Sequence, residues 1–186
     1  MRDSPASGLR CTANSHSCEL HPMPDTNPEN RLRALEDIEA IRSLKARYLA
    51  CCDAKDPAGM RACFVDGPVA IDYGVMGCFD RADALVEIFK QIGCHPHMVE
   101  MHHGVNPQIT VHSADQAEGR WGLHYQLINT RDNTLTQLGA YYEDAYRKTA
   151  AGWKLSACKC VVTSTLVLKL SADTVQAMVI GRMPAA

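Results

Sequence analysis

Three side chains with acid–base chemistry stand in two short segments that are far apart in the chain. Tyr48 and Asp53 begin and end the segment YLACCD, and His102 belongs to the segment MHHG. A carboxylate that orients an imidazole, with a phenol close by, can move a proton without a metal or an organic cofactor. If the fold brings Asp53 to His102, we expect a small proton-transfer enzyme.

The first segment lies at the end of a predicted helix. The helix macrodipole disfavours a negative charge there, so Asp53 would gain from a cationic or hydrogen-bond-donating partner. Tyr48 precedes Asp53 by five residues, which separates their directions by about 140° on an ideal helix. Tyr48 is therefore expected to share a pocket with Asp53 only if the helix ends or distorts near Cys51 and Cys52. Otherwise it is an ordinary core tyrosine.

The second segment lies on a predicted strand. His102 and His103 are adjacent, so they face opposite sides of the sheet. The parity of the later apolar residues, such as Val111, favours His103 as the inward residue. Gly104 and Pro107 permit a bulge that would reverse this parity. Periodicity alone therefore leaves the choice between the two histidines open.

The order of the predicted elements indicates an α+β fold. The first half is predicted to form helices from about residue 31 and over 58–64 and 80–93, with short strands over 69–73 and 77–79. Asp80 is expected to cap the third helix. The second half is predicted to form four long strands, over 98–111, 117–129, 136–148 and 153–168. This pattern favours a strongly curved antiparallel sheet with three helices on its concave face and a pocket between the two layers.

Apolar side chains at helical spacing predict the buried face of the first helix. They are Leu35, Ile38, Ile41, Leu44, Tyr48 and Leu49. The polar side, expected to face solvent, comprises Glu36, Asp37, Glu39, Arg42 and Lys45. In the second long strand Trp121, Leu123, Tyr125 and Leu127 share one face, which predicts an apolar interior. Trp121 and Tyr125, together with Tyr73, are the candidate substrate contacts.

Composition limits the class of protein. The chain has 186 residues, 46% of them hydrophobic, and a net charge of -2, which suits one soluble domain with a tail. We expect a loosely attached arm over 1–28, a domain over 29–170 and a tail over 171–186. No basic face is evident, so nucleic acid is not an expected partner. No apolar run is long enough to span a membrane, and no secretory signal is evident, so a cytoplasmic location is expected.

The cysteines are expected to be reduced thiols. There are nine, an odd number, and none forms a CxxC pair. Without an export signal this usage is typical of a cytoplasmic protein. Cys158 and Cys160 would share one strand face, but two ligands do not make a zinc site. We therefore predict no metal.

Several segments in the same order resemble SnoaL-like proteins of the nuclear-transport-factor-2-like superfamily. They are 37–48 (DIEAIRSLKARY), 53–56 (DAKD), 101–111 (MHHGVNPQITV), 119–121 (GRW), 139–146 (GAYYEDAY) and 152–154 (GWK). The resemblance covers about residues 31–168 and is greatest to the branch that holds scytalone dehydratase, bile acid 7α-dehydratase and hexachlorocyclohexane dehydrochlorinase. It implies a cone-like α+β barrel of the cystatin-like type.

The resemblance also implies site residues. The Asp–His dyad of the family falls on Asp53 and His102, which requires a bulge before Ile109, and the dehydratase helix tyrosine falls on Tyr48. Two positions depart from the relatives. Tyr125 stands where the bile acid dehydratase carries a second acid, and Val162 stands where two relatives carry an arginine. The dyad is therefore expected to be shared, and the substrate is not.

These residues together predict a cofactor-independent lyase that eliminates water or formaldehyde from a hydrophobic alcohol. The alcohol is expected to be aromatic or polycyclic. His102 would be the base, Asp53 would orient it, and Tyr48 and Tyr125 would donate hydrogen bonds. The alternatives are a ketosteroid-type isomerase and a non-catalytic ligand-binding or assembly module of the same fold. One face of the last strand, with Val161, Thr163, Thr165 and Val167 or the alternate set, is too apolar to leave wet. We therefore expect a homo-oligomer, either a dimer or a trimer.

Overall fold

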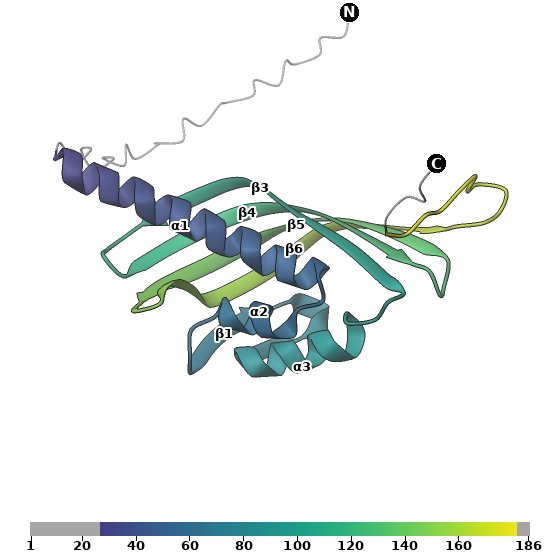
Figure 1. The fold of residues 1–186 in the computed structure, drawn as a ribbon, viewed down its shortest axis with the longest axis horizontal. Helices are drawn as coiled ribbons and strands as arrows, with labels where there is room; N and C mark the ends of the chain where they lie inside the picture. Colours follow the sequence, from purple (N-terminus) through teal and green to yellow (C-terminus); the bar gives the residue numbers. More distant parts are fainter. Residues whose placement is uncertain (1–26, 182–186) are drawn as a thin grey trace, which may run out of the picture.

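The computed structural model describes residues 27–181, so almost all of the predicted N-terminal arm lies outside the described residues. Within this range three helices pack on a six-stranded sheet (Figure 1). The helices are α1 (Pro28–Asp53), α2 (Pro57–Ala62) and α3 (Ala82–Ile92), with a single 3-10 turn, η1 (Gly74–Met76). The strands are β1 (Pro68–Asp72), β2 (Cys78–Arg81), β3 (Met98–Val111), β4 (Gln116–Asn129), β5 (Thr134–Thr149) and β6 (Gly152–Lys169). The predicted α+β class and the order of the elements are confirmed.

The sheet has the strand order β2-β1-β6-β5-β4-β3. Strands β3 to β6 form the predicted antiparallel meander. Strand β1, however, runs parallel to β6, so the sheet is mixed and not purely antiparallel. Its edges, β2 and β3, do not pair with each other, so the cone is open. In the chain, the paired strands β1 and β6 are separated by the four strands β2 to β5.

Helix α1 lies across the concave face of the sheet, beside the edge strand β3 (Figure 1). Ile41, Leu44, Tyr48 and Leu49 from its predicted apolar face are buried against the sheet. Leu35 is 63% exposed, contrary to the prediction. The periodic pattern therefore extends beyond the part of the helix that packs on the core.

Two polar residues of α1 were wrongly predicted to face solvent. The Lys45 side chain is fully buried, and the Asp37 side chain is only 13% exposed. Both contact partners on the sheet, and helical periodicity cannot reveal such partners. A buried lysine requires a specific partner, because an unpaired charge is costly to remove from water.

The helix ends have clear local causes. Asn27 caps α1 by accepting a hydrogen bond from the Glu29 amide at 2.9 Å. After α1, Lys55 adopts a φ of 57°, which reverses the chain, and Asp56 caps α2 through the Gly59 amide. The prediction that Asp80 caps α3 was wrong. Asp80 lies within β2, and the cap position is Arg81, which makes no side-chain cap bond.

A bulge in β3 decides which histidine faces inward. The pairing of β3 with β4 shifts between Val105 and Gln108, and Asn106 between them has a φ of 50°. His102 therefore lies opposite Tyr125 on the concave face, and His103 is exposed on the other. The bulge implied by the family resemblance is confirmed. It explains why simple parity counted back from Val111 favoured the wrong histidine.

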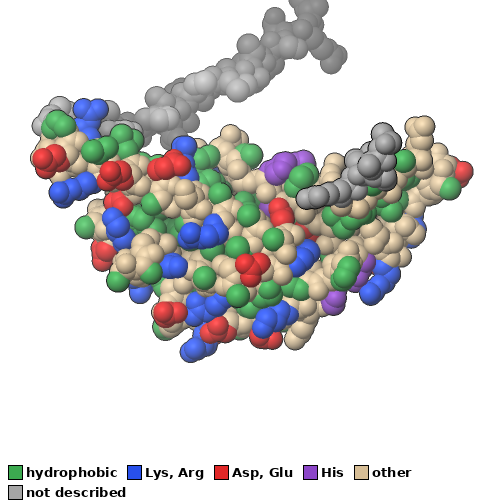
Figure 2. Space-filling model, in the orientation of Figure 1, with side chains coloured by type: hydrophobic (Ala, Val, Ile, Leu, Met, Phe, Trp, Pro, Cys, Tyr) green, Lys and Arg blue, Asp and Glu red, His purple; other side chains and the backbone are tan. Residues whose placement is uncertain are grey.

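The far end of β6 is exposed on both faces. A register shift opposite Gly139 and Ala140 places Val162 and Val167 on the concave side, where they are 50% and 59% exposed. Leu166 and Leu168 are also exposed. Hydrophobic side chains are visible at the end of the molecule where the strands extend beyond the helices (Figure 2). The expected homo-oligomer remains a prediction. Within residues 27–181, no helix is long and apolar enough to cross a membrane.

Candidate active site

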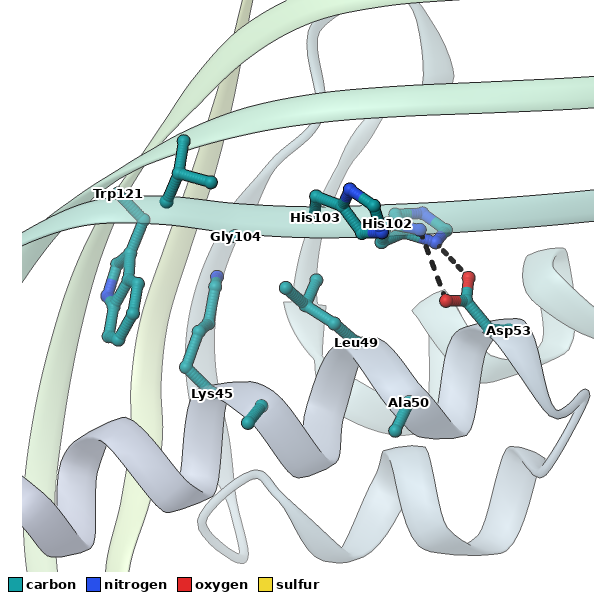
Figure 3. A pocket seen from close by; sticks show the side chains of 10 residues that line it. Lys45, Leu49, Ala50, Asp53, His102, His103, Gly104 and Trp121 are labelled. Carbon is teal, nitrogen blue, oxygen red and sulfur yellow. Dashed lines mark hydrogen bonds and ion pairs between the residues drawn. The ribbon is translucent and has the colours of Figure 1, made fainter.

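The end of α1 and the middle of β3 meet through Asp53 and His102 (Figure 3). Oδ1 of Asp53 lies 2.6 Å from Nδ1 of His102, and Oδ2 accepts the His102 backbone N–H at 3.1 Å. The two side chains are 30% and 13% exposed, so they are partly shielded and still accessible. The backbone and ring bonds together fix the carboxylate against both the strand and the imidazole. They also compensate Asp53 for its unfavourable place at the helix C-terminus.

This contact assigns the histidine tautomer. A carboxylate can only accept, so Nδ1 carries a proton, and in the neutral imidazole Nε2 presents its lone pair. Among residues 27–181, no side chain hydrogen-bonds Nε2. The arrangement is that of a general base oriented from behind by an acid.

Gly104 allows the helix to approach the strand at this point. A Cβ atom at position 104 would lie 2.8 Å from Cδ1 of Leu49. Leu49 stands one helical turn before Asp53, so the close packing that glycine permits also brings the carboxylate within reach of His102. The segment MHHG therefore combines the imidazole with the small residue that lets its partner approach.

The dyad lies at one end of a pocket of about 400 Å³ between α1 and β3 (Figure 3). This volume is within the range of small-ligand sites. The lining is mixed, with apolar side chains beside the polar groups of the dyad. The lining residues are Lys45, Ala46, Leu49, Ala50, Asp53, His102, His103, Gly104, Val105 and Trp121.

A second polar group stands beside the dyad on the concave face, and sequence reasoning identified only one of its three members. The Tyr125 ring lies 4.7 Å from the His102 ring, centroid to centroid. Its hydroxyl donates to Oε1 of Glu100 at 2.8 Å, and Oε2 of Glu100 forms an ion pair with Lys55. Glu100 has the same strand parity as His102, which was the available signal. Lys55 lies in the turn that immediately follows Asp53.

Burial affects the titration of this group. It raises the pKa of the Tyr125 phenol, and the nearby Asp53 carboxylate raises it further. The phenol therefore keeps its proton at neutral pH. Burial lowers the pKa of Lys55, although nearby acidic groups act in the opposite direction.

Tyr48 and Tyr73 are not brought to the dyad. Tyr48 is 2% exposed, its hydroxyl hydrogen-bonds that of Tyr73, and its ring packs edge-on against Phe64. The Tyr73 hydroxyl also lies 3.3 Å from the Cys158 sulfur. Helix α1 runs through Asp53, so the distortion that would direct Tyr48 and Asp53 into one pocket is absent from it. Burial raises the pKa of both phenols well above the usual value.

Trp121 lines the pocket, as its strand parity predicted, and it begins a buried network that the sequence did not reveal. Its indole N–H donates to the Tyr146 hydroxyl at 2.9 Å, which donates to Oδ2 of Asp144 at 2.8 Å. Nζ of Lys45 lies 2.8 Å from the same oxygen and 3.4 Å from the ring centroid of Tyr142. The charge of Lys45 is thus held by a carboxylate and an aromatic face.

The cysteines within the described residues are all free thiols. Burial raises the pKa of Cys52 to about 12 and that of Cys158 well above the usual value, so both remain protonated. Residues 27–181 contain no group of three or more His, Cys, Asp or Glu side chains that could hold a metal ion.

Comparison with known proteins identifies the family. Residues 33–159 match the SnoaL-like domain. The chain belongs to the SnoaL-like family. The match runs from within α1 to the first half of β6 and so includes both members of the dyad.

Solved structures show the same fold. A candidate scytalone dehydratase from Novosphingobium aromaticivorans is 20% identical, with a TM-score of 0.68 over 84% of this chain and 99% of that chain. The hexachlorocyclohexane dehydrochlorinase LinA-type3 from Novosphingobium barchaimii is 18% identical, with a TM-score of 0.66 over 74% and 94%. An NTF2-like protein with a cystatin-like fold from Novosphingobium aromaticivorans is 23% identical, with a TM-score of 0.61 over 82% and 96%. At these identities the likeness of this SnoaL-like protein to its neighbours establishes the fold.

Proposed function

We propose that this SnoaL-like protein is a cofactor-independent lyase that eliminates water or formaldehyde from a hydrophobic alcohol. The observation that supports this most directly is the 2.6 Å contact between Nδ1 of His102 and Oδ1 of Asp53. It leaves Nε2 with a lone pair and an orienting carboxylate behind the ring, which is the minimal apparatus of a general base. Structural neighbours named as a dehydratase and a dehydrochlorinase are consistent with elimination chemistry.

In the dehydration reaction, Nε2 of His102 removes a proton from the carbon next to the carbinol carbon. The electron pair of that C–H bond forms the double bond as the C–O bond breaks. Asp53 stabilises the imidazolium, which then returns its proton to the departing hydroxide to form water. In the formaldehyde reaction, the same nitrogen removes the O–H proton of a hydroxymethyl group. The electron pair of that O–H bond forms the C=O bond of formaldehyde as the adjacent C–C bond breaks. The carbanion that remains takes the proton back from the imidazolium.

The surroundings of the dyad suit an apolar substrate. Leu49, Val105 and Trp121 line the pocket next to it, and the concave face carries partly exposed aliphatic side chains near Tyr125. Desolvation by such a substrate would strengthen the hydrogen bond between Asp53 and His102, because the local dielectric falls.

Product mass after incubation with hydrophobic alcohols tests the proposal. A panel of polycyclic secondary alcohols and hydroxymethyl arenes should yield a product lighter by one water or one formaldehyde. The variant His102→Ala should lose about 10²-fold to 10⁴-fold in rate. His124→Ala is the matched control, because His124 is an exposed imidazole on the opposite face of the sheet and does not line the pocket. It should stay near the wild-type rate.

Each alternative gives a different result. A product of unchanged mass would indicate an isomerase. A ligand that binds and is recovered unchanged from the wild-type protein would indicate a binding module. Full activity of His102→Ala on a substrate that the wild-type protein converts would rule out the proposed mechanism.

A further inference from the structure

We infer that Tyr125 and Glu100 form a hydrogen-bond-accepting subsite that binds a hydroxyl group carried by the ring of an aromatic substrate. This inference rests on the proposed function, because it names the class of substrate that the site beside His102 takes. It concerns a hydroxyl that anchors the substrate, and not the group that leaves.

The Tyr125 hydroxyl has no proton left to donate to a ligand. A phenol has one proton to donate, and Tyr125 gives it to Oε1 of Glu100 at 2.8 Å. Oε2 of Glu100 is paired with the Lys55 ammonium, and the Glu100 side chain is 11% exposed. The ion pair stabilises Glu100 as a carboxylate, which can only accept. The Tyr125 oxygen therefore meets a ligand as an acceptor, and its remaining lone pairs suit a donor.

This acceptor lies next to the base. Tyr125 pairs with His102 across the β3–β4 ladder, and the two rings are 4.7 Å apart. A ligand that lies against both rings would meet the base and the acceptor together. The neighbouring concave-face residues, Leu127 and Leu138, are aliphatic and only partly buried. An apolar ring with one hydroxyl complements this combination of surfaces.

The subsite should discriminate between a ring hydroxyl and its methyl ether. A ring hydroxyl would donate to the Tyr125 oxygen, whose acceptor strength is increased by the carboxylate behind it. A methyl ether of the same ring has no proton to give and would place its oxygen lone pairs against those of Tyr125. Leaving a polar group of the site unpaired costs about tenfold or more in affinity.

Isothermal titration calorimetry on the full chain with two matched probes tests the inference. The probes are 2-naphthol and 2-methoxynaphthalene, in which a methyl group replaces the hydroxyl proton that can be donated. The wild-type protein should bind 2-naphthol about tenfold more tightly. Tyr125→Phe, which removes the acceptor, and Glu100→Leu, which frees the Tyr125 proton to donate to either probe, should each reduce that ratio to within about threefold of unity. Circular dichroism and thermal melting would establish that both variants are folded.

Tyr141→Phe is the matched control. Tyr141 lies on β5 with the opposite parity, where its ring contacts the Arg120 guanidinium, so its hydroxyl does not belong to the concave face. This variant should keep the wild-type ratio. Equal binding of the two probes by the wild-type protein, tighter binding of the ether, no binding of either probe, or an unchanged ratio in both site variants would overturn the inference.

The variant His102→Ala separates this inference from the lyase proposal. It should retain the preference for 2-naphthol, because the acceptor remains, while it loses turnover. A wild-type protein that eliminates water or formaldehyde but shows no preference between the probes would leave the lyase proposal intact and remove the subsite. A clear preference for 2-naphthol without any turnover would leave the subsite intact and remove the lyase proposal.

Discussion

Helix α1 is joined to the sheet by two acid–base pairs that differ in their solvent exposure and in the groups that surround them. The Lys45–Asp144 pair is sealed, with both side chains 0% exposed. The Asp53–His102 pair is 30% and 13% exposed and lines a pocket. The first pair is surrounded by Tyr142 and Tyr146, and the second leaves one ring nitrogen without a partner among the described residues.

The difference separates a group that holds the fold from a group that can react. A sealed pair has already exchanged its hydration for fixed partners, so removing one member leaves an uncompensated buried charge. An open pair has lost less hydration, and its remaining nitrogen can accept a proton from a ligand. The contribution of the sealed pair should therefore appear in stability, and that of the open pair in rate.

The largest expected effect on stability comes from breaking the sealed pair on one side. Asp144→Ala should lower the free energy of unfolding by about 3–5 kcal/mol, because Lys45 is left charged and buried. Urea denaturation followed by circular dichroism measures the change. The double variant Lys45→Met with Asp144→Leu should recover most of the loss, because a buried pair is often replaceable by apolar groups of similar volume. If the single variant is as stable as the wild-type protein, the pair does not hold the helix.

The open pair should show the opposite response. Asp53→Asn retains the shape of the side chain but no longer stabilises the imidazolium, so the rate should fall by about 10²-fold or more. The free energy of unfolding should change by about 1 kcal/mol or less, as expected for a partly exposed contact. Steady-state kinetics and urea denaturation of the same preparation measure both. A large stability loss with full activity would reverse the roles of the two pairs.

Tyr48 provides a smaller and sharper test. The family resemblance implies a catalytic phenol, whereas the structure places Tyr48 in the core with its hydroxyl on Tyr73. Tyr48→Phe should lower the free energy of unfolding by about 1 kcal/mol, the usual worth of one hydrogen bond. Turnover measured on the same preparation should change less than about threefold. A loss of activity of about a hundredfold in a folded Tyr48→Phe protein would restore the catalytic role.

The sequence predicted the elements well because their signals are local. The strand boundaries of β3 to β6 agree with the prediction within two residues. The parallel strand β1 and the burial of Lys45 were not predicted, since each depends on a partner that is distant in the chain. Local sequence patterns do not reveal such distant partners.

The residues of the candidate site also divide into those that the sequence predicted and those that it did not. Residue types and resemblance identified Asp53 and His102, and the structure places them in contact. Glu100 was missed because a glutamate on a strand is usually a solvated residue, and only its shared parity with His102 marked it. Lys55 was missed because its role depends on the chain reversal at its own φ of 57°. Long-range pairing creates both contacts.

The smallest effect concerns a third link between α1 and the sheet. Asp37 accepts from Lys148 at 2.6 Å and from the Trp153 indole at 2.8 Å. Burial raises the pKa of Asp37, but these two hydrogen bonds outweigh burial and lower it below its ordinary value of 3.8. Since the folded pKa is the lower one, the link contributes its full stability above the unfolded value, and this is lost as the pH falls through the folded pKa.

The variant Asp37→Asn should therefore be slightly less stable than the wild-type protein at pH 7 and should lose less stability on acidification. Thermal melting at a series of pH values from about 6 down to about 3 measures the two slopes. Glu36→Gln is the matched control, because Glu36 is exposed on the same helical turn and should leave the slope unchanged. If Asp37→Asn and Glu36→Gln give the same acid slope as the wild-type protein, the Asp37 link adds no pH-dependent stability.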